Sequence, residues 1–171
     1  MKLLSSLSLL LGAAVASPFH VARDNATDTF YLKTSGAENP DHNDLYVYGY
    51  HTGAGLNDAV LTPDPETAST AFLNGTSVQF AYNNPFPWGL LPVGVTNYAA
   101  WQFVQINAGD GAEGFFVDST GLQWSEQNGF GGWLVCDWYH NAPQLFYIYR
   151  YYTAKYPVSC SEVKLQTVST A

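Results

Sequence analysis

Short runs of apolar and β-branched residues recur along this chain, and polar turns separate them. From Thr29 onward the runs are rich in Val, Leu, Tyr, Phe and Trp, and Gly, Asn, Asp or Pro bounds them. This pattern is typical of β-strands joined by turns. The predicted strands are 30–33, 45–51, 59–61, 71–73, 78–82, 100–106, 114–117, 122–125, 133–138, 144–151 and 163–168. No segment repeats its apolar residues with the 3.6-residue period of an α-helix. Only residues 65–72 could supply a helical turn.

Residues 131–138, Gly-Gly-Trp-Leu-Val-Cys-Asp-Trp, form the clearest of these strands. Alternation along a strand places two sets of side chains on opposite faces. The first set is Trp133, Val135 and Asp137, and the second is Leu134, Cys136 and Trp138. Both sets contain large apolar side chains, so the strand is expected to anchor the core. If Asp137 is enclosed there, Arg150 is its expected partner.

Two further stretches indicate how the strands are layered. Residues 144–151 are apolar on both faces, which predicts a central strand covered on each side. Residues 85–92 contain three prolines, which argue against a central strand, yet Phe86, Trp88, Leu90 and Leu91 call for burial. We therefore expect an ordered loop packed across one end of the fold.

The strand series predicts an all-β fold, a single compact antiparallel β-barrel or β-sandwich of about 10–12 strands. Residues 71–81 and 115–125 resemble one another: each runs from aromatic and aliphatic residues through a polar turn to aliphatic-Gln-aromatic. This pair could reflect an internal repeat, so a β-trefoil stays open as the alternative.

The N-terminus has the features of a secretory signal peptide. Residues 1–16 carry Lys2, a short leucine-rich run, and small residues at Ala14 and Ala16 with cleavage spacing. Residues 17–28 are polar and without periodicity, as in a flexible N-terminal arm, and 29–171 form a single all-β domain. We therefore expect an extracellular or cell-wall-associated protein with no membrane span.

Composition and charge limit the classes of partner that this chain is expected to bind. The chain is 47% hydrophobic and 16% aromatic but only 12% charged, which is far from a disordered composition. Without residues 1–16 it has five basic against fourteen acidic residues, a net charge of −9. Such a chain repels phosphate backbones, so nucleic acid is not an expected partner. We expect a monomer whose partner is a glycan or a host protein.

The chain has two cysteines, Cys136 and Cys160. In an oxidising compartment they are most simply one disulfide, which would stabilise the fold by about 3–4 kcal/mol in the chain-entropy model. A catalytic thiol would need an unpaired cysteine beside a histidine. His140 lies four residues after Cys136, but no second histidine follows, so no metal site is predicted.

No catalytic motif or cofactor signature is assembled in the sequence. A Gly-x-Ser-x-Gly elbow is missing, and the four histidines form no i, i+4 pair. A glycoside hydrolase would need two carboxylates facing one another, which spacing does not reveal. The carboxylates considered for it are Asp41, Asp44, Asp58, Asp110, Glu113, Asp118, Glu126 and Asp137. We therefore predict no catalytic residue, with the hydrolase as a distant alternative.

Exposed aromatic rings suggest a carbohydrate-binding, lectin-like module as the nearer alternative, since a ring can stack on the C–H face of a sugar. Trp88 in the proline-rich stretch and Tyr139 after a strand are the rings most expected at the surface. Trp124 and Asn141 complete the candidate ligand-binding set. Two glycosylation sequons begin at Asn25 and Asn74.

Residues 43–61, 72–76 and 131–138 resemble a family of small secreted proteins of ascomycete fungi, mostly of unknown function. Some members carry the label "IgE-binding protein", which implies recognition by host antibody. The resemblance covers most of the mature chain, is consistent with a signal peptide, one disulfide and a compact β domain, and supplies no catalytic residues. Our leading hypothesis is thus a secreted, non-enzymatic fungal surface or extracellular protein.

Overall fold

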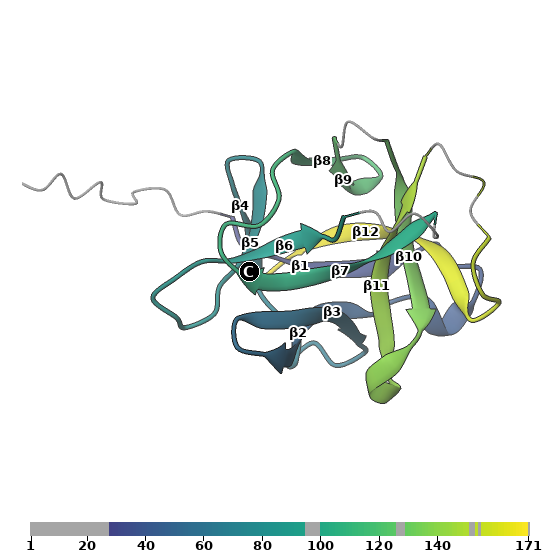
Figure 1. Cartoon of the computed structure of the whole chain (residues 1–171), viewed down its shortest axis with the longest axis horizontal. Coiled ribbons are helices and arrows are strands. Elements are labelled where there is room, and N and C mark those ends of the chain that lie inside the picture. The colour runs from purple at the N-terminus through teal and green to yellow at the C-terminus, as the bar shows by residue number, and fades with distance from the viewer. Residues whose placement is uncertain (1–27, 95–99, 126–128, 151–152, 154, 171) are drawn as a thin grey trace, which may run out of the picture.

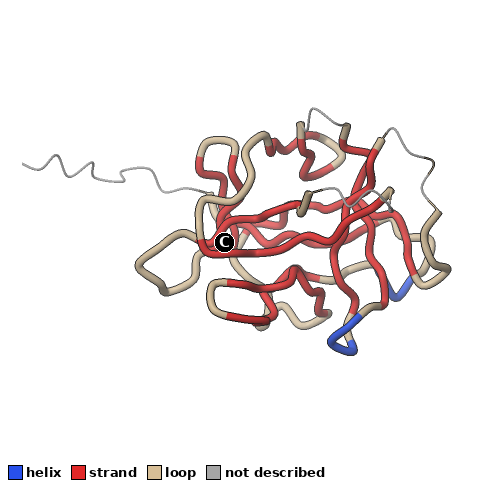
Figure 2. Tube along the Cα trace, viewed as in Figure 1, coloured by secondary structure: helices blue, strands red, loops and turns tan. Residues whose placement is uncertain are grey.

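The computed structural model describes residues 28–94, 100–125, 129–150, 153 and 155–170 (Figure 1). The predicted signal peptide, Asn25 and all of the predicted arm except Asp28 lie outside these residues. The described part of the chain is nearly all β, as Figure 2 shows, and 58% of its residues are in strands and 5% in helices. The predicted all-β class is therefore confirmed.

Twelve strands and two short 3-10 helices occur in the described residues. The strands are β1 (Phe30–Ser35), β2 (Tyr46–Gly53), β3 (Leu56–Thr62), β4 (Ala71–Asn74), β5 (Ser77–Phe80), β6 (Trp88–Pro92), β7 (Trp101–Ala108), β8 (Phe115–Asp118), β9 (Gly121–Trp124), β10 (Phe130–Asp137), β11 (Pro143–Tyr149) and β12 (Cys160–Ser169). The helices are η1 (Pro40–His42) and η2 (Tyr139–Asn141). Residues 65–67 form a turn and no helix.

Ten of the strands form one antiparallel sheet in the order β10-β12-β1-β2-β3-β11-β7-β6-β5-β4. Additional pairings join β10 to β11, β1 to β4 and β3 to β7, and the sheet closes into a nine-strand antiparallel barrel. The hairpin β8–β9 forms a separate two-stranded sheet beside it (Figure 1). Closure leaves few free strand edges, which is how barrels avoid edge-to-edge association.

The two hairpins with similar sequences are both present, as β4–β5 and β8–β9. They occupy different places, since β4–β5 belongs to the large sheet and β8–β9 does not. A trefoil repeat would put them in equivalent positions. The barrel is therefore the architecture, and the sequence similarity reflects two ordinary hairpins.

Strands β10 and β11 are covered on both faces, as their sequences predicted. Trp133 and Val135 point into the barrel and belong to its main core with Tyr147. The opposite face carries a smaller cluster on the outside of the barrel. This outer cluster consists of Leu134, Cys136, Phe146, Ile148 and Cys160, and Trp101, Phe103 and Tyr156 pack against it.

A disulfide joins Cys136 to Cys160 within the outer cluster. The two residues lie directly opposite one another in the antiparallel pair β10–β12. The cross-link therefore ties the last strand of the barrel to β10, as the prediction of one disulfide requires.

The proline-rich stretch is not entirely a loop, contrary to expectation. Strand β6 occupies Trp88–Pro92 and pairs along its whole length with β7. Two of the three prolines precede the strand, and Pro92 is its last residue, so no proline interrupts the ladder. The prolines mark the ends of a buried strand.

Candidate functional site

The loop between β10 and β11 has a strained backbone. His140 has φ of 68° and Asn141 has φ of 53°, so two consecutive non-glycine residues adopt the left-handed conformation. Each such residue costs about 1–2 kcal/mol, and it persists only where surrounding contacts hold it. Backbone strain of this kind clusters at functional sites, so this loop is a candidate site.

The contacts that hold this loop come from the neighbouring hairpin β2–β3. The Nε2 atom of His140 lies 2.9 Å from Oδ2 of Asp58, and each side chain is only 18% exposed. The His140 ring also stacks on Tyr50, with 4.1 Å between ring centroids. Tyr50 and Asp58 are register partners in the ladder between β2 and β3. A rigid pair of strands thus fixes the loop on the outside of the barrel.

Three aromatic side chains around this anchor remain open to solvent. Tyr139 is 72% exposed, Trp138 41% and Tyr50 39%. We call the group of Tyr50, Asp58, Trp138, Tyr139, His140 and Asn141 the Tyr139 surface. Single exposed rings are common on proteins, but a contiguous group on a fixed loop is typical of a binding site.

Trp138 links the Tyr139 surface to the outer cluster beneath it. Its ring contacts Tyr139 edge to face at 5.5 Å. On its other side it meets Trp101 and Phe146, each at 5.6 Å between centroids. The exposed indole is therefore held by the buried ring of Phe146 and the partly buried ring of Trp101, and little freedom remains to be lost when a ligand packs on it.

The polar groups of the Tyr139 surface can hydrogen-bond a ligand at the border of the rings. Asp58 offers carboxylate oxygens, Asn141 an exposed amide, and His140 the second nitrogen of its ring. Asp58 is the single carboxylate among the six residues. A hydrolytic mechanism with two facing carboxylates therefore has no second member within this group.

A family model described as a domain of unknown function, DUF7907, matches residues 27–169. The chain belongs to the DUF7907 family. No curated protein and no solved structure matches it. The matched region begins just before β1 and ends at the last residue of β12, so this DUF7907 domain includes the whole barrel.

The four residues predicted to bind a ligand are separated in the DUF7907 barrel. Tyr139 and Asn141 lie together on the Tyr139 surface. Trp88 was expected to be exposed, and that is wrong: its ring is 8% exposed and belongs to the main core. Trp124 is half-buried on β9 between Phe115 and Tyr147, so it lies apart from the loop.

The sequence offered no signal for the partners of this loop. Asp58 and His140 are 82 positions apart, and Asp58 appeared only among the eight carboxylates considered for a hydrolase. Tyr50 alternates along β2 with nothing to distinguish it from Tyr46 or Tyr48. Only the pairing of β2 with β3, and of β3 with β11, brings these side chains together.

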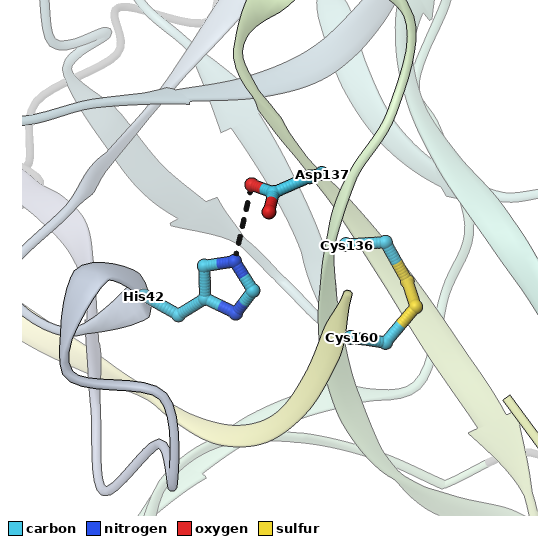
Figure 3. Close-up of a disulfide and its surroundings, with 4 residues drawn as sticks. All are labelled: His42, Cys136, Asp137 and Cys160. Carbon is cyan, nitrogen blue, oxygen red and sulfur yellow. Dashed lines mark hydrogen bonds and ion pairs between the residues drawn. A yellow bond between two sulfur atoms is a disulfide. The ribbon is translucent and has the colours of Figure 1, made fainter. Parts of the chain in front are cut away.

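A second histidine–carboxylate pair lies near the disulfide (Figure 3). His42 on η1 is fully buried, and its Nε2 atom lies 3.3 Å from Oδ1 of Asp137. Asp137 itself is exposed, so the condition under which Arg150 was its expected partner is not met. Its side chain leaves the end of β10, where the barrel no longer covers it. The pair fastens η1 to β10, on the side of the strand away from the disulfide (Figure 3).

Asn74, the second sequon residue, is exposed at the turn between β4 and β5. Its Nδ2 atom donates to Oε1 of Gln79 at 3.2 Å. Among the residues that the structure describes, no group of three or more His, Cys, Asp or Glu could hold a metal ion. Within those same residues no helix is long and apolar enough to cross a membrane.

Proposed function

We propose that this DUF7907 protein is a secreted, non-catalytic carbohydrate-binding protein that takes up a sugar on the Tyr139 surface. The observation that carries the proposal is the strained loop at His140, which holds Trp138 and Tyr139 in the open beside polar side chains. Sugars present C–H groups on one face and hydroxyl groups at their edges. A ring with hydrogen-bonding neighbours complements both.

Rigidity supports this assignment over a simple surface patch. The strain of the two left-handed residues is offset by the contacts of His140 with Asp58 and Tyr50. A loop fixed before the ligand arrives does not lose conformational entropy on binding. A preformed loop matters most for weakly binding ligands such as sugars, because each sugar makes few contacts.

We extend the proposal to the setting of the protein. The signal-peptide pattern of residues 1–16, the disulfide and the exposed sequon at Asn74 all suit export from the cell. The resemblance to secreted ascomycete proteins suggests a fungal wall or its surroundings as the place of action. Recognition by host IgE would then follow from exposure of the protein to a host.

A glycan array followed by calorimetric titration of the best glycan tests the proposal. We expect the wild type to bind, and Tyr139→Ala and Trp138→Ala each to weaken binding about tenfold. The matched control is Phe116→Ala, which removes a ring that is 45% exposed on β8, outside the Tyr139 surface. Its affinity should equal that of the wild type.

The proposal would be overturned in two ways. One is an array on which the wild-type protein binds no glycan. The other is a loss of affinity in Phe116→Ala as large as that in Tyr139→Ala, because binding would then depend on general hydrophobicity and not on this surface.

A further inference from the structure

A pocket of about 460 Å³ opens at the start of β12, where the chain after β1 meets the segment that precedes β12. Its size is within the range of small-ligand sites. The pocket is lined by Glu38, Asn39, Tyr156, Pro157, Val158, Cys160 and Ser161. We call it the Tyr156 pocket. No basic side chain is among these lining residues.

The back of the Tyr156 pocket is fixed by the outer cluster. Tyr156 packs against that cluster, which contains the disulfide, and Cys160 itself lines the pocket. Ser161 is 5% exposed, and its Oγ atom accepts a hydrogen bond of 3.3 Å from the backbone N–H of Asn39. The pocket therefore combines the aromatic ring of Tyr156 on one side with polar groups of Ser161 and Asn39 that a hydrogen bond already holds in position.

Two carboxylates lie near Tyr156: Glu38 lines the pocket, and Glu162 is outside its lining and borders it through the Tyr156 hydroxyl. The Tyr156 hydroxyl donates to Oε1 of Glu162 at 2.5 Å. This hydrogen bond, together with burial and the negative charges of Glu162 and Glu38, raises the pKa of Tyr156 to about 12. Among the described residues neither Glu38 nor Glu162 has an ion-pair partner. The pocket thus presents unneutralised negative charge beside an aromatic ring, which favours a cation.

The Tyr156 pocket and the Tyr139 surface share the same aromatic layer. Tyr156 and Trp101 both pack against the outer cluster. Trp101 in turn contacts Trp138 of the Tyr139 surface at 5.6 Å. The pocket and the surface therefore border the same layer of rings on the outside of the barrel.

We infer that the Tyr156 pocket binds the protonated amine of an amino sugar, so that the preferred ligand of this protein is a glucosamine-containing oligosaccharide. The inference rests on the proposed function and specifies the class of sugar. The ammonium group pairs with Glu38 in the pocket and with Glu162 at its border, beside the Tyr156 hydroxyl, and the sugar ring packs on Tyr156. An acetylated amine has no charge to pair, and acidic sugars are repelled.

Calorimetric titration with two oligomers of equal length, one of glucosamine and one of N-acetylglucosamine, tests this inference at about pH 6 and low salt. We expect the wild type to bind the glucosamine oligomer about fivefold more tightly, because exposed ion pairs are individually weak. The double variant Glu38→Gln/Glu162→Gln should lose this preference and keep its affinity for the acetylated oligomer. The control Glu66→Gln/Glu113→Gln makes the same charge change at exposed positions outside the pocket and should keep the preference.

The outcomes separate this inference from the proposed function. Equal binding of the two oligomers by the wild type, or a preference that survives in Glu38→Gln/Glu162→Gln, overturns the role of the Tyr156 pocket and leaves the Tyr139 surface unaffected. Failure of the wild type to bind the glucosamine oligomer also overturns it, whatever other glycans are bound. If Tyr139→Ala leaves both affinities unchanged while the preference persists, the pocket is upheld and the role of the Tyr139 surface is wrong.

Discussion

His140 makes the contacts that offset the strain of the loop between β10 and β11, and its replacement by alanine should release that loop. The substitution removes the hydrogen bond to Asp58 at 2.9 Å, a contribution of about 1 kcal/mol. It also removes the stacking on Tyr50, which is about 1 kcal/mol more. The left-handed backbone would remain unfavourable for alanine. We therefore expect His140→Ala to lower the free energy of unfolding by about 2 kcal/mol.

Replacement of His140 by glycine separates the side-chain contacts from the backbone. Glycine loses the same two contacts but adopts a φ of 68° without the steric cost of a Cβ atom. We expect His140→Gly to lower the free energy of unfolding by only about 1 kcal/mol. The His140→Gly variant should therefore be more stable than the His140→Ala variant. In ordinary strands and helices, alanine is the more stabilising of the two residues.

Urea denaturation followed by tryptophan fluorescence measures both values. In a domain of this size, 2 kcal/mol corresponds to a fall in melting temperature of about 4–8 °C. The matched control is His51→Ala, which removes an exposed histidine from β2 and should change stability by less than about 0.5 kcal/mol. If His140→Ala proves as stable as His140→Gly, or more so, the strained loop is not held in the way described.

Three further predictions concern other parts of the molecule. Because the disulfide of Cys136 and Cys160 spans 24 positions, Cys160→Ser should lower the free energy of unfolding by about 3 kcal/mol in denaturation experiments, whereas thiol labelling of the native wild type should be absent. The folded state raises the pKa of Tyr156 from 10.0 to about 12, chiefly through its hydrogen bond to Glu162, so it holds this proton more tightly than the unfolded chain does. That stabilisation is complete below about pH 10 and is lost as pH rises through about 12. The stability advantage of the wild type over Tyr156→Phe should shrink across that window in urea titrations, and a constant advantage would contradict it. Mass spectrometry of protein secreted from a eukaryotic host should find a glycan on Asn74 that is missing in Asn74→Gln; an unmodified Asn74 would show that the exposed turn is not used.

Much of the local structure could be predicted because the periodicity of a strand depends only on residues that are neighbours in the sequence. In β10 the alternation placed Trp133 and Cys136 on opposite faces, and the structure has Trp133 in the main core and Cys136 in the outer cluster. The stretch around Trp88 shows where such reasoning failed. Its prolines were read as interrupting a strand, whereas they flank one, and the ring expected at the surface is 8% exposed because β7 and the main core cover it.

The candidate site was predictable only in its exposed members. Tyr139 was selected from its position after a strand, since turn residues are commonly at the surface, and Asn141 as an amide close to it in the sequence. Tyr50 and Asp58 lie on another hairpin, and no local pattern relates them to His140. Glu38 of the Tyr156 pocket and Glu162 beside it were not selected at all, because one follows β1 and the other lies within β12.

The sequence by itself determined most of the strands, the alternation of their two faces, the tight turns and the identity of the single possible disulfide. These features depend on the alternation of side chains, on turn-forming residues and on having two cysteines, all of which are local or countable properties. The tertiary structure decided that β3 pairs with both β2 and β11, that the sheet closes, and that His140 meets Asp58. Such contacts depend on which strands become neighbours, and strand order is set by the packing of the whole barrel, which no short window of sequence contains.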